Sequence, residues 1–172
     1  MKIAFLDRDG TIVSDYPDED WKGRIIPEVL DGALEGMKRL RQLGFEIIIV
    51  TNQYIINDVI ITTDEYEQFT QNLKTIFDEN NVKVLDIFHC PHSSHEKCKC
   101  KKPMTGMIES ALAKYPSIDL SNSIMIGDSE SDHQLANNLN LKFYRVDSSK
   151  PVGMNGVYQS IEEIIEQGNI DE

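Results

Sequence analysis

The sequence is poor in basic residues, in cysteine and in long apolar runs, and each shortage narrows what the protein can do. Only 17 lysines and arginines stand against 29 aspartates and glutamates, which gives a formal net charge of −12. A strongly basic face usually binds phosphate backbones, so this charge makes a nucleic-acid partner unexpected. A small anionic substrate remains compatible with the composition, provided that the chain supplies a local positive site.

No stretch of the chain approaches the roughly 20 apolar residues needed to cross a bilayer, so no membrane association is expected. The first residues already predict a strand and lack the charged start, apolar middle and cleavage site of a signal peptide. We therefore expect a cytoplasmic protein. A chain of 172 residues with 40% apolar residues is long enough for one sizeable core, so we expect one domain over residues 1–172, and a monomer.

Short runs rich in branched residues predict five strands, over residues 2–6, 46–50, 84–88, 123–126 and 141–146. Apolar spacing and capping residues predict helices over about 29–43, from Thr62, over 105–114, from Ser131 to about 139, and from Ser160. Strands and helices that alternate in this way predict an α/β fold with a doubly wound, Rossmann-like and mainly parallel sheet. Ligands bind such sheets beyond the carboxyl ends of the strands.

Asp7 and Asp9 lie two residues apart, directly after the first predicted strand. Two nearby carboxylates repel each other, so proteins keep such a pair mainly where a cation or a shared proton compensates the charge. An acidic turn is the plainer interpretation, since Asp and Gly commonly follow strands. Thr51 and Asp128 follow two further strands, and Lys102 precedes a helix that reaches the same edge. These residue types suit phosphoryl transfer through a magnesium-bound aspartate.

Four short motifs occur in order along the chain, from residue 3 to about residue 146. They are Asp7-Arg8-Asp9-Gly10-Thr11, Thr51 after an apolar strand, Lys102-Pro103, and Gly127-Asp128 with Asp132. Together they resemble the motifs of the haloacid dehalogenase (HAD) superfamily of phosphatases. The resemblance implies a HAD-like fold, and the motif spacing leaves no room for a large cap domain. The cysteine-rich segment from residue 90 to 103 narrows the resemblance to subfamily IIIA, which holds heptose bisphosphate and histidinol-phosphate phosphatases.

The resemblance also implies roles for individual residues. Asp7 would attack phosphorus and form an aspartyl-phosphate, while Asp9 would act as general acid and then as general base. Mg²⁺ would be held by Asp7, the backbone carbonyl of Asp9, and Asp128. Thr51 and Lys102 would bind the remaining phosphoryl oxygens. The further candidates for substrate contact are Arg8, Thr11, Asn52 and Lys101.

All three cysteines lie within eleven residues. Cys90, Cys98 and Cys100 combine with His92 into a Cys-x-His and Cys-x-Cys set, which supplies the four ligands that tetrahedral zinc takes. A disulfide would leave one cysteine unpaired and is disfavoured in the cytosol. The thiols could instead be free and buried, and His95 could replace His92 as the fourth ligand. We predict a structural zinc loop over residues 90–100, which aims Lys101 and Lys102 at the site.

The sequence departs from the family pattern at two positions. Relatives commonly carry a cation where this chain has Ser129, and often arginine where it has Lys101. With no large cap domain, loops must set specificity, and the acidic run at 18–20 would favour an amine-bearing substrate if it approached the site. We expect a phosphatase of a sugar (heptose) bisphosphate, with histidinol phosphate as the alternative. A nucleic-acid end phosphatase and a non-catalytic, zinc-bearing binding module remain further possibilities.

Overall fold

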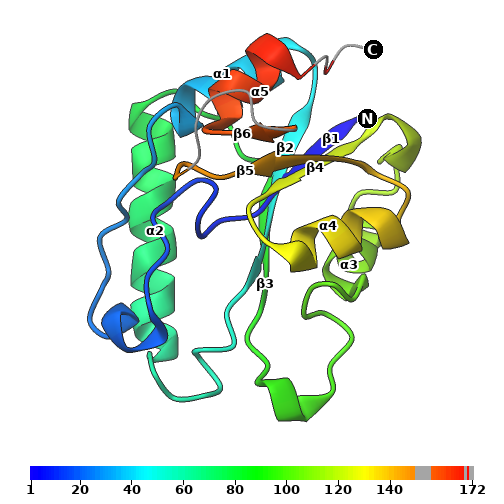
Figure 1. The fold of residues 1–172 in the computed structure, drawn as a ribbon. Coiled ribbons are helices and arrows are strands. Elements are labelled where there is room, and N and C mark those ends of the chain that lie inside the picture. Colours follow the sequence, from blue (N-terminus) through cyan, green and yellow to red (C-terminus); the bar gives the residue numbers. More distant parts are fainter. Residues whose placement is uncertain (150–155, 169, 171–172) are drawn as a thin grey trace.

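In the part of the chain that the structure describes, six parallel strands form one central sheet, with helices on both faces (Figure 1). This computed structural model describes residues 1–149, 156–168 and 170. The sheet order is β3-β2-β1-β4-β5-β6. The strands are β1 (Ile3–Leu6), β2 (Glu46–Asn52), β3 (Asp86–Cys90), β4 (Ile124–Gly127), β5 (Lys142–Val146) and β6 (Val157–Tyr158). The predicted doubly wound parallel sheet is confirmed.

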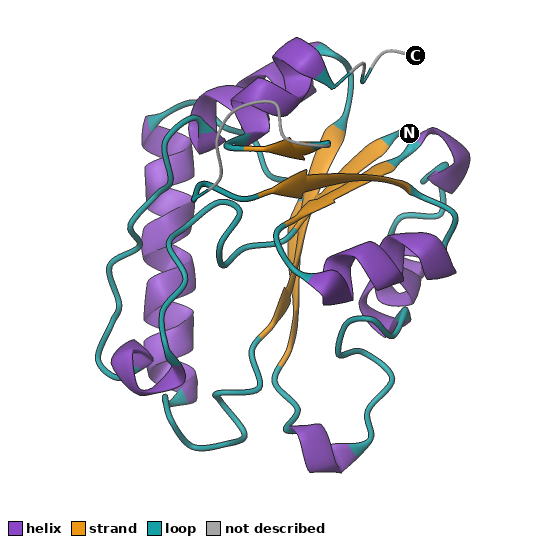
Figure 2. Cartoon of the chain, in the orientation of Figure 1, coloured by secondary structure: helices purple, strands orange, loops and turns teal. Residues whose placement is uncertain are grey.

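The helices divide between the two faces of the sheet (Figure 2). On one side lie α1 (Ala33–Gln42), α2 (Thr63–Glu79) and α5 (Ile161–Gln167), and on the other lie α3 (Gly106–Lys114) and α4 (Glu130–Asn138). Alternate residues of β1 serve the two layers, since Ala4 and Leu6 belong to one apolar cluster and Ile3 and Phe5 to the other. This explains why the central strands are apolar at every position.

The chain order creates a switch point in the middle of the sheet. From β1 the chain winds outward through β2 to β3, and it then returns to place β4 against the other side of β1. A crevice opens at such a point, beyond the carboxyl ends of the strands. Within the described residues, loops and short 3₁₀ turns, rather than a folded cap domain, flank this edge. Throughout the described residues, the helices are too short or too polar to span a membrane.

The predicted boundaries differ from the structure mainly where chain turns interrupt a pattern. The first helix begins at Ala33 rather than near Val29, because Val29 bridges to Val13 and Gly32 adopts a left-handed conformation with φ of 74°. The third strand begins at Asp86, two residues after its predicted start, since its pairing with β2 starts there. The strand β6 was missed, because two residues are too few to show a period.

Helix caps were predicted with mixed success. Thr62 and Glu65 form the predicted capping box at the start of α2, and the Ser160 hydroxyl accepts from the Glu163 amide at α5. The prediction that α4 opens at Ser131 is wrong. Ser129 is the N-cap, and it forms a capping box with Asp132.

Candidate active site

A cavity of about 200 Å³ lies at the carboxyl ends of β1, β2 and β4. The predicted strand-end residues line it, and Lys102 joins them from the loop before α3. These lining residues are Asp7, Asp9, Thr51, Asn52, Lys102 and Asp128. Residues separated by more than 100 positions therefore meet at the switch point of the sheet.

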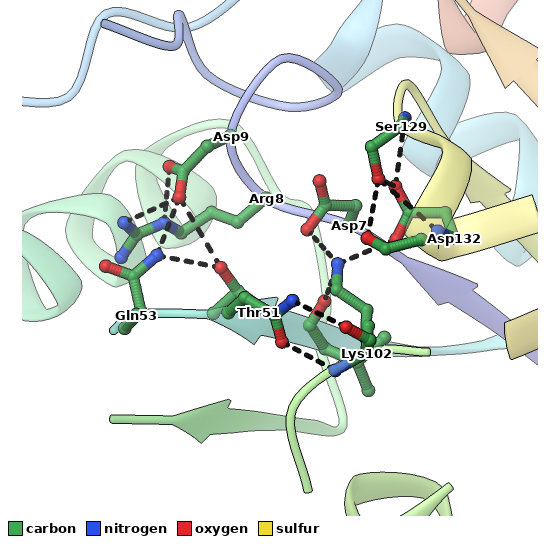
Figure 3. A network of polar contacts seen from close by, with 11 residues as sticks. Asp7, Arg8, Asp9, Thr51, Gln53, Lys102, Ser129 and Asp132 are labelled. Atoms are coloured by element: carbon green, nitrogen blue, oxygen red, sulfur yellow. Dashed lines mark hydrogen bonds and ion pairs between the residues drawn. The ribbon is translucent and has the colours of Figure 1, made fainter. Parts of the chain in front are cut away.

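Lys102 is the buried cation at the base of this cavity, with a side chain only 2% exposed. Its Nζ lies 2.5 Å from Asp7 Oδ1 and 2.7 Å from Asp132 Oδ1, and it donates to the backbone oxygen of Val50 at 3.0 Å (Figure 3). Burial alone would lower the pKa of Lys102, but the charges of Asp7 and Asp132 raise it above its ordinary value. The lysine is therefore a fixed positive charge beside the Asp7 carboxylate.

The negative charge around Lys102 exceeds what one lysine can balance. Carboxylate oxygens of Asp7, Asp128 and Asp132 lie within 4.8 Å of one another. Burial, followed by the charge of Asp132, raises the pKa of Asp7 well above its ordinary value. The same two causes raise the pKa of Asp128 to about 6. Three acids against one cation leave a deficit of positive charge, which a bound cation would fill.

Asp132 is fully buried and holds Lys102 from behind. Its other oxygen, Oδ2, accepts from the Ser129 hydroxyl at 2.6 Å and from the Ser129 backbone amide at 3.1 Å. Its interactions therefore face Lys102 and the start of α4. The departure from the family pattern at Ser129 has a structural consequence, because the short hydroxyl both caps α4 and orients Asp132.

The turn after β1 requires glycine at position 10. Gly10 has φ of 80°, and a Cβ added there would lie 2.2 Å from Asp128 Oδ2. Backbone of this handedness disfavours residues with side chains. The missing side chain therefore lets the β1 loop lie directly against the Asp128 carboxylate.

Asp9 belongs to a second polar network on the other side of the loop (Figure 3). Its carboxylate accepts from Arg8 Nε and Nη2 at 2.8 and 3.0 Å, and from Gln53 Nε2 at 2.6 Å. Gln53 also donates to Thr51 Oγ1 at 2.8 Å. Gln53 was missed as a site residue from the sequence, although its place two residues after Thr51 in an extended segment puts both side chains on the same side.

Two residues predicted to contact substrate, Arg8 and Thr11, do not line this cavity. The side chain of Arg8 is 3% exposed and packs behind Asp9 rather than lining the cavity. Thr11 is 1% exposed and also lies outside the lining. Aromatic rings from distant segments of the chain lie within 5.6 Å of the Arg8 guanidinium carbon and determine its position.

Asn52 and Lys101 connect the cavity to the cysteine-rich loop. The Asn52 side chain accepts from the Lys102 amide at 2.8 Å and donates to the Lys102 carbonyl at 3.2 Å, so it fixes the backbone that carries the buried lysine. Lys101 donates to Ser94 Oγ at 3.0 Å, and its Nζ lies 4.3 Å from the centre of the Tyr54 ring. Asn52 lines the cavity, whereas Lys101 lies outside the lining, next to the cavity-lining Tyr54.

The outer wall combines acids with aromatic rings. Asp15, Asp18, Tyr16, Trp21 and Tyr54 all line it. The Tyr54 hydroxyl donates to Asp18 at 2.8 Å, and burial followed by this hydrogen bond raises the pKa of Tyr54 to about 12. Burial also raises the pKa of Asp15. The acidic run therefore does reach the cavity, through Asp18.

The three cysteines and His92 form a compact cluster. Cys90 Sγ lies 2.9 Å from Cys100 Sγ and 3.5 Å from Cys98 Sγ, and His92 Nδ1 lies 3.1 Å from Cys100 Sγ. A disulfide has an S–S length of about 2.05 Å, and all three thiols are free. Ligands around tetrahedral zinc lie roughly 3–4 Å apart, given metal bonds of about 2.0–2.3 Å. His92, not His95, belongs to the group that can hold a metal ion.

Comparisons with known proteins agree with this geometry. Residues 2–148 match the family described as polynucleotide kinase 3 phosphatase. The chain is 40% identical over 143 residues to the D-glycero-alpha-D-manno-heptose-1,7-bisphosphate 7-phosphatase of Photorhabdus laumondii, covering 77% of this chain and 74% of that protein. It is 33% identical over 147 residues to the histidine biosynthesis bifunctional protein HisB of Campylobacter jejuni, covering 84% of this chain but 41% of that protein.

The fold is also shared with solved structures. A D,D-heptose 1,7-bisphosphate phosphatase from B. bronchiseptica, complexed with magnesium and phosphate, superposes with a TM-score of 0.81. Its sequence is 24% identical, and the similarity covers 100% of both chains. The resemblance drawn from the four motifs is confirmed: the chain belongs to the polynucleotide kinase 3 phosphatase family within the HAD superfamily.

Proposed function

We propose that the protein is a Mg²⁺-dependent phosphomonoesterase that acts, as one domain, on a small phosphorylated metabolite. The observation that carries this proposal is the pair of carboxylates, Asp7 and Asp128, that share one cavity with the buried cation Lys102. A nucleophile and a fixed positive charge for the phosphoryl oxygens are the minimum that phosphoryl transfer needs.

The donor set fits magnesium. Asp7, Asp128 and the backbone carbonyl of Asp9 would hold the ion, since Mg²⁺ prefers oxygen ligands and the site lacks positive charge. When bound, the ion would neutralise charge on the phosphoryl group. Asp132 is an unsuitable ligand in this arrangement, because it is fully buried and does not line the cavity.

The residues of the chain would then act in two displacements at phosphorus. Asp7 forms a bond to phosphorus as the bond to the leaving alkoxide breaks, and Asp9 gives that alkoxide its proton. In the second step Asp9 takes a proton from water, whose oxygen attacks phosphorus and frees Asp7. Lys102 and Thr51 bind the phosphoryl oxygens throughout.

Magnesium should stabilise the protein more strongly at neutral than at acidic pH. The pKa of Asp128 is raised from 3.8 to about 6 in the fold, so its contribution to stability is favourable below the unfolded value and is lost as pH rises through about 6. Mg²⁺ would compensate the charge that appears above this pH. We expect a larger magnesium-induced rise in melting temperature at about pH 7.5 than at about pH 5. Thermal melts with and without added magnesium measure it, and an equal shift at both pH values would contradict the assignment of Asp128.

We also propose that the Cys90, His92, Cys98 and Cys100 cluster holds one structural zinc ion. Four protein ligands leave no open position for water, and the loop reaches the cavity through Lys102. Cys100→Ser should weaken zinc binding by at least about 100-fold, since removing an outer-shell partner alone weakens binding about 10–100-fold. Metal analysis and melting temperature measure the effect. His95→Ala is the matched control, and retention of one zinc per chain by the Cys100→Ser variant would contradict the ligand set.

A sugar bisphosphate of the heptose type is the proposed substrate. Support comes from the Photorhabdus relative, which carries that activity in its name and shares 40% identity with this chain. Histidinol phosphate is the second candidate. Asp15 and Asp18 on the cavity wall favour it, because carboxylates attract an amine and repel a second phosphate, and the HisB relatives are consistent with it.

Phosphate release from a panel tests these proposals. The panel contains heptose 1,7-bisphosphate, histidinol phosphate and a 3′-phosphorylated oligonucleotide, each with magnesium and with magnesium omitted. We expect magnesium-dependent release from the heptose compound and none from the oligonucleotide. Faster release from histidinol phosphate would replace the proposed substrate by the second candidate. No release from any phosphomonoester would reject the phosphatase and leave the zinc-bearing binding module.

A further inference from the structure

We propose that Arg8 is a positioning residue that fixes the Asp9 carboxylate for proton transfer, with Oδ1 as the atom that carries the proton. The proposal rests on the function proposed above, in which Asp9 is the general acid. It goes beyond that function because it assigns a role to a buried arginine that does not touch the cavity.

Arg8 holds both oxygens of its neighbour. Nε donates to Asp9 Oδ1 at 2.8 Å and Nη2 to Asp9 Oδ2 at 3.0 Å, a two-point contact that fixes the plane of the carboxylate (Figure 3). In the described part of the chain, Nη1 of Arg8 is buried without a hydrogen-bond partner. The polar contacts of the guanidinium are therefore directed at Asp9.

Aromatic side chains hold the guanidinium in place. Cζ of Arg8 lies 4.7 Å from the ring centre of Phe69, and 5.6 Å from those of Trp21 and Tyr66. Trp21 and Phe69 also pack edge to face, with ring centres 5.6 Å apart. Cations are attracted to aromatic faces at these distances, and burial removes the competition of water. The cage joins the 3₁₀ turn Asp18–Trp21 to α2, so Arg8 has little room to move.

The two oxygens of Asp9 differ in their surroundings. Oδ2 accepts from Gln53 Nε2 at 2.6 Å and from Thr51 Oγ1 at 3.5 Å, in addition to Arg8. Among the described residues, Oδ1 accepts only from Arg8 Nε. A carboxylate oxygen has two lone pairs, so Oδ1 keeps one for a proton. Asp9 lines the cavity with a side chain 16% exposed, which leaves that lone pair within reach of a leaving group.

The consequence is a fixed proton donor. A donor held in one orientation transfers its proton without first searching for the leaving oxygen, and good positioning of this kind contributes strongly to rate. In the step proposed here the proton on Oδ1 passes to the alkoxide oxygen as the phosphorus–oxygen bond breaks. Oδ1 is left ionised and paired with Arg8, and it recovers a proton from the attacking water.

A comparison of leaving groups tests the role of Arg8. The aryl oxygen of p-nitrophenyl phosphate leaves readily without a proton, whereas an alkyl oxygen needs one. Arg8→Met should lower kcat/KM about 100-fold for the alkyl phosphate hydrolysed fastest in the panel, and less than about threefold for p-nitrophenyl phosphate. Arg8→Lys, which keeps a charge but loses the two-point contact, should fall between.

Three further variants separate positioning from a general loss of structure. Asp9→Asn should show the same dependence on leaving group, and adding Arg8→Met to it should lower the rate no further. Phe69→Leu loosens the aromatic packing around Arg8 without changing Arg8 itself. It should lower the rate for the alkyl phosphate more than for p-nitrophenyl phosphate, but less strongly than Arg8→Met does. It therefore still tests the proposal if Arg8→Met fails to fold. Arg24→Met is the matched control, since Cζ of Arg24 lies 3.7 Å from the Tyr16 ring centre and contacts neither Arg8 nor Asp9.

Equal losses for the two leaving groups would overturn the proposal, as would an additional loss in the double variant. A wild-type protein that hydrolyses neither compound would reject the phosphatase function itself, and this inference with it. The two failures are therefore distinguished by the wild-type rates.

Discussion

Asp7→Asn should abolish phosphate release while the protein stays folded. The amide of asparagine keeps the shape of the side chain but cannot serve as the nucleophile, so we expect a loss of more than about 10⁴-fold in kcat. The fold should not suffer, because burial and the charge of Asp132 already disfavour an ionised Asp7. Removing this charge leaves Lys102 paired with Asp132 and should raise the melting temperature at neutral pH. Phosphate release and thermal melting measure the two effects.

The control for this variant is Asp31→Asn, which removes an exposed carboxylate outside the cavity. We expect it to keep the wild-type rate. Hydrolysis that survives in Asp7→Asn at the wild-type level would exclude an aspartyl-phosphate on this residue. Loss of both activity and melting temperature would instead assign Asp7 a structural role.

Lys102→Met should combine a large loss of stability with a large loss of rate. Removing one partner of a buried ion pair typically destabilises a protein by about 3–5 kcal/mol, because the remaining charges are left unpaired. Here two carboxylates, of Asp7 and Asp132, would be left facing each other. The rate should fall about 100-fold or more, since the group that binds the phosphoryl oxygens is lost. Urea unfolding and phosphate release give the two quantities.

The pH dependence of the Lys102→Met variant identifies the cause. Burial already raises the pKa of Asp7, and loss of the lysine should raise it further, so the destabilisation should be larger at about pH 8 than at about pH 5, where protonation of Asp7 relieves it. Lys101→Met is the matched control and should change the free energy of unfolding by less than about 0.5 kcal/mol. A destabilisation that is independent of pH would point to lost packing rather than to unpaired carboxylates.

The parts of the fold and site that the sequence predicted share a physical basis. Each predicted strand-end residue is placed by its own strand, and a parallel sheet brings all strand ends to one edge. Asp7, Thr51 and Asp128 could therefore be grouped without knowledge of any contact. The cluster of three cysteines and His92 was predictable for a different reason, since its members lie within eleven residues and so short a segment cannot separate them far.

The parts that were missed depend on side-chain direction. The position of the Arg8 guanidinium depends on Trp21, Tyr66 and Phe69. These residues lie up to 61 positions away in the sequence, so the motif around Arg8 could not predict them. The sequence left open whether the acidic run at 18–20 approaches the site, and the hydrogen bond from Tyr54 to Asp18 places Asp18 on the cavity wall. Contacts of this kind arise from packing between loops, which no periodicity records.

The capping box of α4 limits how the active site can be re-engineered. An obvious way to strengthen anion recognition is to replace Ser129 by lysine or arginine. That exchange removes the hydroxyl that starts α4 and that holds Asp132 in line with Lys102. Anion recognition at position 129 and the alignment of the buried lysine are therefore coupled through the Ser129 hydroxyl. A substitution at this position needs a compensating cap elsewhere in the first turn of α4.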